Sequence, residues 1–193
     1  MTQMTQADFE ARYREHPDPW GYETSAYERE KYEATLAACG PGPYRSAIEL
    51  GSSIGVFSAL LAPRCRLLVT VDAAPTAVAS ARRRLAGSPN VTTILGSIPE
   101  AVPRRDYDLV VASEILYYLD GPRLQDTLDV LRGLTRPGAR FVAVHWRPSG
   151  PERPFAASQV HARLRALPWL TSTRNRPDPP GARDYLLDVL ERR

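Results

Sequence analysis

The chain has 193 residues, of which 43% are hydrophobic and 24% charged, and this composition is typical of one globular domain with a full core. Its 25 basic and 22 acidic residues leave a net charge of only +3, and no basic-aromatic stripe accompanies it, so nucleic-acid binding is not expected. No apolar run approaches membrane-spanning length, and the polar stretch Met1 to Glu15 lacks the apolar core of a secretory signal.

The chain contains two cysteines, Cys39 and Cys65. They form no CxxC pair, and the sequence shows no spacing of metal ligands, so no metal site is expected. Two isolated thiols are typical of a protein in a reducing compartment. We therefore predict a cytoplasmic protein.

The first 43 residues are predicted to form two helices. A polar segment, Gln6 to Glu15, is followed by two prolines that end it. Ser25 is placed to cap a second helix from Ala26 to Cys39, with Glu28 at the capping-box position. A Gly-Pro-Gly-Pro run then ends that helix.

From Tyr44 onward, apolar strands alternate with helices, and an antiparallel strand pair is expected at the end of the chain. The expected strands are Ser46–Leu50, Leu67–Asp72, Val91–Leu95, Tyr107–Ala112, Arg140–Trp146, Trp169–Arg174 and Asp184–Glu191. The expected helices are Val56–Ala62, Thr76–Leu85, Pro122–Leu134 and Phe155–Leu167, with a short helix or loop at Ile98–Val102 and turns at Pro137-Gly138 and over 177–181. Unbroken apolar strands between helices predict an α/β fold, a doubly wound, Rossmann-like seven-stranded sheet with helices on both faces and an antiparallel last strand.

The first strand runs directly into a glycine-bearing turn. Gly51 and Gly55 can adopt positive φ and let a flat ligand approach the main chain, next to a helix N-terminus. The second strand ends at Asp72, about 20 residues further on, which is the spacing of a ribose-binding acid. Together they predict an adenosine-containing cofactor.

These motifs resemble those of the class I S-adenosylmethionine-dependent methyltransferases over about residues 44 to 191. The resemblance is carried by Glu49-Leu-Gly51-Ser-Ser-Ile-Gly55, Val71-Asp72, Gly96-Ser97 and Asp108-Leu-Val-Val-Ala-Ser-Glu114. A dehydrogenase fingerprint would have glycine where this chain has Ser53, which counts against a nicotinamide dinucleotide. The resemblance implies S-adenosylmethionine as the cofactor and S-adenosylhomocysteine as its product.

A narrower resemblance is to the nodulation-protein-S (NodS) N-methyltransferases, which methylate an amino-sugar nitrogen in chitooligosaccharide signals. It is carried by Asp18-Pro-Trp-Gly-Tyr22, Tyr27-Glu-Arg-Glu-Lys-Tyr32, Ser113-Glu-Ile-Leu-Tyr-Tyr-Leu119, Val144-His-Trp-Arg147 and Val160-His161. The substrate does not follow from this resemblance, because related folds act on many substrates.

The resemblance implies a set of cofactor-binding residues, which includes the N-terminal aromatic residues as part of a lid. They are Trp20, Tyr27, Glu49, Gly51, Ser52, Ser53, Gly55, Asp72, Ala73, Gly96, Ser97, Ile98, Ser113 and Glu114. Asp72 would bind the ribose diol, with an N-cap of the next helix as the alternative, and Glu49 would organise the methionine end or serve a purely structural role. Many relatives carry an adenine-binding acid near Ser97, so here either the Ser97 hydroxyl or main chain at Ser97 or Ile98 would make that contact.

Glu114 and His145 end two neighbouring strands, and both are candidates for the base that takes a proton from an amine. The alternatives are a turn cap for Glu114 and a satisfied core histidine for His145. The residues expected to line the acceptor site are Tyr22, Tyr117, Tyr118, His145, Arg147 and His161, with packing as the alternative for the aromatic residues and for His161.

We therefore predict a methyltransferase that transfers a methyl group to an amine of a small molecule, such as an amino sugar or a natural-product scaffold. The alternatives are O-methylation of a small molecule, or a protein that binds the cofactor without transferring its methyl group. Residues 1–43 would form a helical lid segment on a domain of residues 44–193, as a monomer or a homodimer without nucleic-acid or membrane partners.

Overall fold

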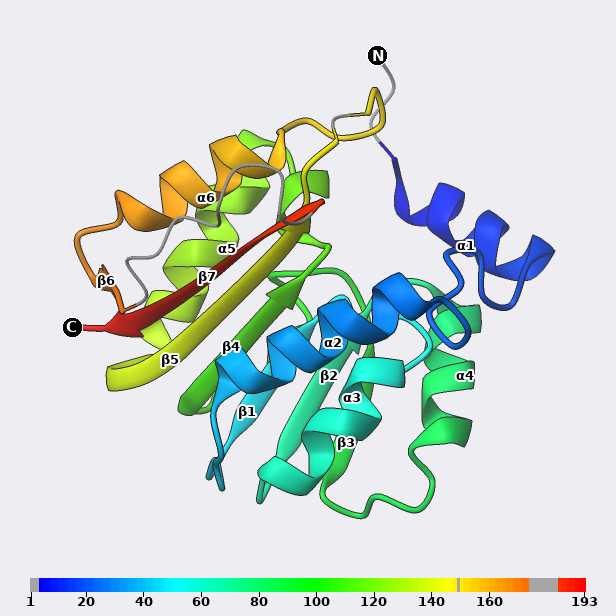
Figure 1. The fold of residues 1–193 in the computed structure, drawn as a ribbon, viewed down its shortest axis with the longest axis horizontal. Coiled ribbons are helices and arrows are strands. Elements are labelled where there is room, and N and C mark those ends of the chain that lie inside the picture. The colour runs from blue at the N-terminus through cyan, green and yellow to red at the C-terminus, as the bar shows by residue number, and fades with distance from the viewer. Residues whose placement is uncertain (1–3, 149, 174–183) are drawn as a thin grey trace.

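The computed structural model describes residues 4–148, 150–173 and 184–193, which form one sheet flanked by helices (Figure 1). The strands are β1 (Ala47–Leu50), β2 (Leu68–Asp72), β3 (Val91–Leu95), β4 (Tyr107–Ser113), β5 (Thr135–Trp146), β6 (Leu170–Ser172) and β7 (Tyr185–Arg192). The helices are α1 (Gln6–Glu15), α2 (Ala26–Cys39), α3 (Val56–Leu61), α4 (Pro75–Arg84), α5 (Gly121–Gly133) and α6 (Ala157–Arg165), with 3₁₀ turns η1 (Ala62–Arg64) and η2 (Leu116–Tyr118).

The sheet has the order β3-β2-β1-β4-β5-β7-β6. β1 to β5 pair in parallel, β7 is antiparallel to β5, and β6 is antiparallel to β7. This confirms the predicted doubly wound sheet, including the antiparallel strand near its edge. The chain reverses direction between β1 and β4, and the crevice beyond the carboxyl ends of such strands is where open α/β sheets bind ligands.

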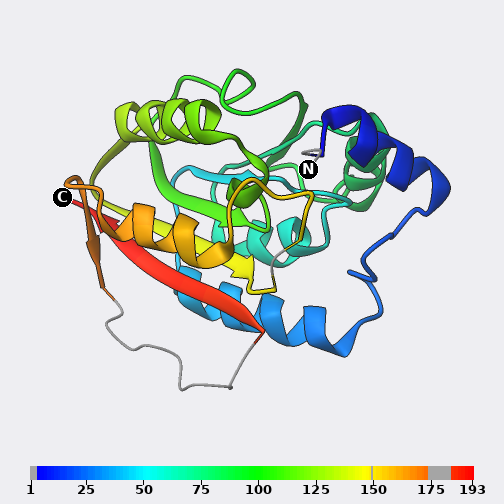
Figure 2. The same ribbon diagram turned by 90° about the horizontal axis from the view of Figure 1, so that it is seen from above.

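Alternate residues of the central strands face two separate layers of helices. In β1, Ile48 and Leu50 join the core beneath α5 and α6, whereas Ala47 joins the core beneath α2 and α3. Figure 2 shows these two helical layers on opposite sides of the sheet. Burial on both faces explains why these strands read as continuous apolar runs rather than alternating ones.

The helix ends follow local capping chemistry. Thr5 and Asp8 form a complete capping box that starts α1. The predicted Ser25 cap of α2 is present, because its hydroxyl accepts the backbone N–H of Glu28. The predicted capping box is wrong in its second half, since the Glu28 carboxylate binds Lys31 instead of returning to Ser25.

The start of β5 differs from the prediction. β5 begins at Thr135, before the expected Pro137-Gly138 turn, and its pairing with β4 shifts register between Tyr107 and Leu109. The residues of β5 before Arg140 form a bulge-like irregularity, and the strand stays in the sheet on both sides of it. Within this irregularity Gly138 adopts a φ of +86°. The predicted strand end at Arg174 and the loop over 177–181 lie outside the described residues.

Within the described residues, no helix is both long enough and apolar enough to cross a membrane.

Candidate functional site

A cavity of about 1120 Å³ opens at the carboxyl edge of the parallel strands. β1, β2 and β4 bring Gly51, Asp72 and Ser113 to this edge, and the two N-terminal helices supply the opposite wall. The volume slightly exceeds the range of about 300–1,000 Å³ that is usual for small-molecule sites. The cavity therefore has room for a cofactor together with part of a second molecule.

The turn after β1 approaches the cavity through Gly51, whose φ is +73°. A Cβ at Gly51 would lie 3.0 Å from the Ile115 Cβ, so the cradle depends on glycine. Gly55 also has positive φ, at +78°, but it is not among the lining residues, and a Cβ there would lie 3.1 Å from the Cα of Ala81 in α4. The prediction that Gly55 passes under a ligand is therefore corrected: it allows helix α4 to pack closely.

Asp72 closes the same turn from the end of β2. Its carboxylate accepts the backbone N–H groups of Ser53 at 2.7 Å and Ala74 at 2.9 Å. Burial raises the pKa of Asp72, while these hydrogen bonds oppose that shift. The alternative role as N-cap is not what the structure shows, because Glu10 of α1 accepts the Thr76 backbone N–H and hydroxyl of α4.

Glu49 lies in β1 with its side chain buried in the cavity wall. The Ser58 hydroxyl of α3 donates to its carboxylate at 2.5 Å. Burial raises the pKa of Glu49 to about 8, and the nearby charge of Asp72 acts in the same direction. The carboxyl group is therefore mostly protonated at neutral pH until a cation or a further donor reaches it.

The far end of the cavity is formed after β3, where Gly96, Ser97 and Ile98 all line it. Gln6 of α1 extends into this end: its amide nitrogen donates to the Ala73 carbonyl at 2.8 Å, and its amide oxygen accepts the Ser97 hydroxyl at 3.4 Å. Gln6 was not predicted as a site residue, and it brings an amide group to this end of the cavity.

Aromatic side chains from the N-terminal segment form the roof. Trp20 packs between Tyr13 of α1, at 5.3 Å between ring centroids, and Tyr22, at 5.8 Å. Phe9 meets Tyr118 of η2 edge-on at 5.0 Å, and the Tyr13 hydroxyl donates to Ser53 at 2.5 Å. Helix α1 thus spans the cavity from the Gly51 turn to η2, and Trp20, Tyr22 and Tyr118 line the cavity as predicted.

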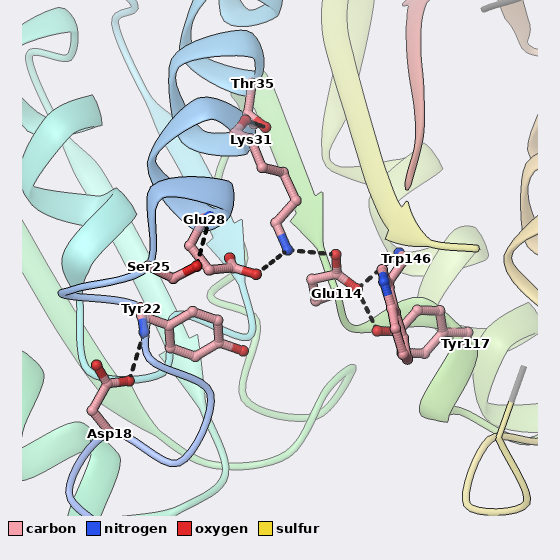
Figure 3. Close-up of polar contacts among 9 residues, drawn as sticks. All are labelled: Asp18, Tyr22, Ser25, Glu28, Lys31, Thr35, Glu114, Tyr117 and Trp146. Carbon is pink, nitrogen blue, oxygen red and sulfur yellow. Dashed lines mark hydrogen bonds and ion pairs between the residues drawn. The ribbon is translucent and has the colours of Figure 1, made fainter. Parts of the chain in front are cut away.

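Glu114 follows β4 with a φ of +56°, an uncommon conformation for a residue other than glycine. Its Oε1 pairs with the Lys31 ammonium at 2.9 Å, and its Oε2 accepts the Trp146 backbone N–H at 3.0 Å and the Tyr117 hydroxyl (Figure 3). Lys31 also pairs with Glu28 at 2.8 Å. Burial alone would lower the pKa of Lys31, but the two carboxylates raise it above its ordinary value, so the side chain is an ammonium.

His145 is not positioned to act as a base. It is fully buried and absent from the lining residues, and its Nε2 accepts the Leu116 backbone N–H at 3.2 Å. Its Nδ1 faces His161 Nε2 at 3.0 Å, and His161 Nδ1 faces Asp188 at 2.9 Å. Burial holds the pKa of His145 well below its ordinary value, so both the geometry and the charge state fit a neutral ring that anchors η2.

Two further members of the predicted acceptor set, His161 and Arg147, also lie outside the cavity lining. His161 is fully buried in α6 behind the cavity wall, and Arg147 is exposed with its Nε donating to the Tyr185 carbonyl at 3.3 Å. Neither is among the residues that line the cavity. The remaining predicted residues do meet there: Trp20, Tyr22, Tyr27, Glu49, Gly51, Ser52, Ser53, Asp72, Ala73, Gly96, Ser97, Ile98, Ser113, Glu114, Tyr117 and Tyr118.

Sequence reasoning missed further contributors besides Gln6. Glu28 and Lys31 lie three residues apart on α2, a spacing that places them on one helix face, and this was the available signal for their pairing. Tyr13 gave no comparable signal. Arg153 was also not anticipated: its guanidinium stacks over the Tyr117 ring at 4.8 Å and over the Trp146 ring at 5.1 Å.

The sequence matches the profile of the family "Nodulation protein S (NodS)" over residues 2–148. The chain belongs to the NodS family. Nodulation protein S of Sinorhizobium fredii (strain NBRC 101917 / NGR234) is 34% identical over 104 residues, which cover 53% of this chain and 48% of that protein. That of Rhizobium tropici is 29% identical over 127 residues, covering 65% and 53%. The matched region thus spans about half the length of these curated relatives.

Solved structures share the fold. NodS N-methyltransferase of Bradyrhizobium japonicum WM9, in complex with S-adenosyl-L-homocysteine, superposes with a TM-score of 0.84 at 22% identity, covering 98% of this chain and 99% of that one. A Pseudomonas syringae protein, whose methyltransferase assignment is itself provisional, has a TM-score of 0.74 at 34% identity, covering 87% and 100%. The superposition on the NodS structure therefore includes nearly all of this chain.

The wall of the cavity near the Gly51 turn offers several polar groups to a ligand. The Gly51 cradle would be filled by any Cβ, and the Asp72 carboxylate lies in the wall with two of its acceptor positions used. Ser52 Oγ is buried in the same wall and has no hydrogen-bond partner among the described residues. A turn with an unpartnered hydroxyl and a carboxylate fits the amino-acid half and ribose of an S-adenosyl cofactor.

Proposed function

We propose that this chain is an S-adenosylmethionine-dependent N-methyltransferase that acts on an amine of a small molecule, such as an amino sugar or a natural-product scaffold. The observation that carries the proposal is the cavity at the strand edge, which the Gly51 turn, Asp72 and Glu114 line together. Membership of the NodS family supports the choice of nitrogen as the methyl acceptor.

The residues divide the cavity between the two ligands. Gly51, Ser52 and Asp72 would hold the methionine and ribose parts of the cofactor, and Gln6, Ala73 and Ser97 would surround its base. When bound, the cofactor would supply an activated methyl group on a sulfonium. What remains for the protein is to align the acceptor for in-line attack and to exclude water, which the aromatic roof over the cavity favours.

Glu114 would stabilise positive charge on the acceptor side of the cavity. Its lone pairs already accept bonds from Lys31, Trp146 and Tyr117, so we assign it to positioning and electrostatic stabilisation of a cation. This narrows the role expected from the sequence, in which Glu114 was one of two candidate bases.

Residues 1–43 would act as the lid of a single compact domain, with α1 as its moving part. Helix α2 contributes Tyr32, Ala38 and Cys39 to the core against the sheet, whereas α1 contributes Tyr13 to a smaller cluster that includes Ala77 of α4. Both cysteines are buried free thiols, which supports the proposed cytoplasmic location.

A mass-spectrometric screen tests the proposed activity. The full chain would be incubated with S-adenosylmethionine and separate sets of amino sugars, aminoglycosides, small amines and matched hydroxyl compounds. We expect S-adenosylhomocysteine together with a product about 14 Da heavier from at least one amine, the mass gained when methyl replaces hydrogen. Methylation of hydroxyl compounds alone would contradict N-methylation, and cofactor binding without product from any acceptor would contradict the enzyme assignment.

A further inference from the structure

At one point of the cavity wall, two carboxylates share a single ammonium group. Lys31 Nζ lies 2.8 Å from Glu28 Oε1 and 2.9 Å from Glu114 Oε1. The side chains are 3% exposed for Lys31, 9% for Glu28 and 14% for Glu114, so water screens them poorly. Figure 3 shows the ammonium between the two acids, which leaves this cluster with one surplus negative charge.

Of the two carboxylates, Glu28 rather than Glu114 has an oxygen without a partner among the described residues. Both oxygens of Glu114 accept hydrogen bonds, from Lys31 on one side and from Trp146 and Tyr117 on the other. Glu28 Oε2, in contrast, is buried and has no partner among the described residues. Burial raises the pKa of Glu28, and the charges of Glu114 and Asp18 add to that shift while Lys31 opposes it.

A second orphaned atom lies on the neighbouring residue. The Tyr27 hydroxyl is buried without a partner among the described residues, and Tyr27 and Glu28 both line the cavity. An unsatisfied buried polar group destabilises the fold, so two of them on residues that line the same cavity indicate a missing hydrogen-bonding ligand. The ring of Tyr27 already faces a cation, since Lys31 Nζ lies 5.4 Å from its centroid.

We propose that Glu28 Oε2 and the Tyr27 hydroxyl form the subsite that binds the acceptor as a protonated amine, so that the charge of Glu28 selects cationic acceptors over neutral hydroxyl compounds. Before methyl transfer, the bound ammonium group passes its proton to Glu28 Oε2, which frees the nitrogen lone pair for attack. This inference rests on the proposed function and deepens it by assigning the specificity to a residue of helix α2. An ammonium group donates hydrogen bonds and carries the positive charge that the cluster lacks, whereas a neutral hydroxyl group supplies only the hydrogen bond.

The test compares benzylamine, protonated at neutral pH, with benzyl alcohol, which has the same ring and no charge. Ligand-detected NMR would give both dissociation constants at about pH 7 for the full chain saturated with S-adenosylhomocysteine. We expect the wild type to prefer benzylamine by about 10-fold or more and Glu28→Gln to reduce that preference below about 3-fold. Tyr27→Phe, which keeps the ring and all charges, is expected to weaken benzylamine binding by about 2- to 5-fold.

Glu30→Gln is the matched control, because Glu30 is exposed two positions further along the same helix. It is expected to retain the full preference. Equal affinity of the wild type for the two probes, or an unchanged preference in Glu28→Gln, would overturn the proposal. So would a selective loss of S-adenosylmethionine over S-adenosylhomocysteine affinity in Glu28→Gln, since the charge would then serve the sulfonium.

The outcomes separate this proposal from the proposed function. A charge preference that depends on Glu28, in a protein that methylates no amine in the screen, would leave the cation subsite standing and remove the N-methyltransferase assignment. Amine methylation with no dependence of acceptor affinity on Glu28 would do the reverse.

Discussion

Asp72 shows how one side chain can serve the fold and a ligand together. Its carboxylate holds the turn through the N–H groups of Ser53 and Ala74, and it still has acceptor capacity toward the cavity. A carboxylate can accept from two backbone donors and from two hydroxyl groups at once. An amide cannot, because half of its hydrogen-bonding capacity is donor.

Asp72→Asn is therefore expected to weaken S-adenosylhomocysteine binding by about 10- to 100-fold, the equivalent of one or two charged hydrogen bonds. One backbone donor would also meet the amide NH₂, so we expect a loss of about 1–3 kcal/mol in the free energy of unfolding. Calorimetric titration and urea unfolding measure the two effects. Asp126→Asn, an exposed position on α5, is the control, and a stability loss with unchanged affinity would reduce Asp72 to a turn residue.

Glu49 makes the stability of the protein depend on pH. Burial raises its pKa from an ordinary value of 4.5 to about 8, so the folded state binds a proton that the unfolded state releases. The contribution of this group is complete below pH 4.5 and is lost as the pH rises toward 8. Glu49→Gln has no such proton and keeps an acceptor for the Ser58 hydroxyl.

We therefore expect the wild type to lose about 2 kcal/mol of unfolding free energy relative to Glu49→Gln between about pH 6 and pH 8. Urea unfolding of both proteins across that range, without cofactor, gives the difference directly, and other titrating groups cancel in it. Parallel stability curves would show that Glu49 is ionised in the folded state throughout that range, and that burial does not raise its pKa into it.

At the scale of elements, most of the fold could be predicted because local signals and tertiary packing agree. Ser25 begins α2 as expected, and the buried strands β1 and β2 read as apolar runs that end at Gly51 and Asp72. The start of β5 could not be predicted, because the Pro137-Gly138 turn signal is real but the sheet absorbs it as an irregularity. Tertiary pairing decided this boundary against the local pattern.

The site could be predicted only in part. Parallel strands bring their carboxyl ends to one edge, so Gly51, Asp72 and Ser113 were found from their places at strand ends together with the family resemblance. His145 was misplaced because strand position was considered without strand face. The period-2 rule puts it on the same side of the sheet as Ala143, in the core beneath α5 and α6 and away from the cavity. The pairing of Lys31 with Glu114 joins residues 83 positions apart, which spacing alone does not reveal.

Helix α1 is tied to the domain at a few points, which is consistent with the lid role that we propose for it. Glu10 accepts the Thr76 backbone N–H at 2.9 Å and the Thr76 hydroxyl at 2.7 Å, which also caps α4. Few buried contacts and exposed polar ties are the features of a segment that opens locally. Closing it over a bound ligand would exclude water from the cavity.

Glu10→Ala is expected to loosen α1 and to weaken S-adenosylhomocysteine binding by about 3- to 10-fold. The reason is that a smaller fraction of the free protein would have α1 docked over the cavity and ready to bind. Hydrogen exchange should accelerate in α1 and at the start of α4 and leave the central strands protected. Glu15→Ala, at the exposed end of the same helix, should change neither measurement. Faster exchange in α1 with full cofactor affinity would mean that the helix covers the cavity without contributing to binding.

For the molecule as a whole, the cavity couples the sheet to the N-terminal helices and to the segment beyond β5. The Gly51 turn comes from β1, Ile115 from the segment after β4, and the roof from the N-terminal helices, whose neighbour Met4 donates its N–H to the Glu152 carbonyl. A ligand in this space would contact elements that otherwise meet only through side chains. Binding should then stabilise the whole fold rather than one loop.

The rise in stability on cofactor binding can be tested at two glycines that differ in their surroundings. S-Adenosylhomocysteine at about 100 times its Kd should add about 2.7 kcal/mol, or about 5–10 °C in Tm for a chain of this length. Gly51→Ala should lower the Tm of the free protein and abolish most of the ligand shift, because a Cβ at φ +73° would meet Ile115 at 3.0 Å and narrow the cradle. Gly87→Ala, where a Cβ meets nothing within 4 Å, should keep the full shift. If Gly51→Ala lowers the Tm but retains the full ligand shift, this glycine serves the turn alone and the cofactor lies elsewhere in the cavity.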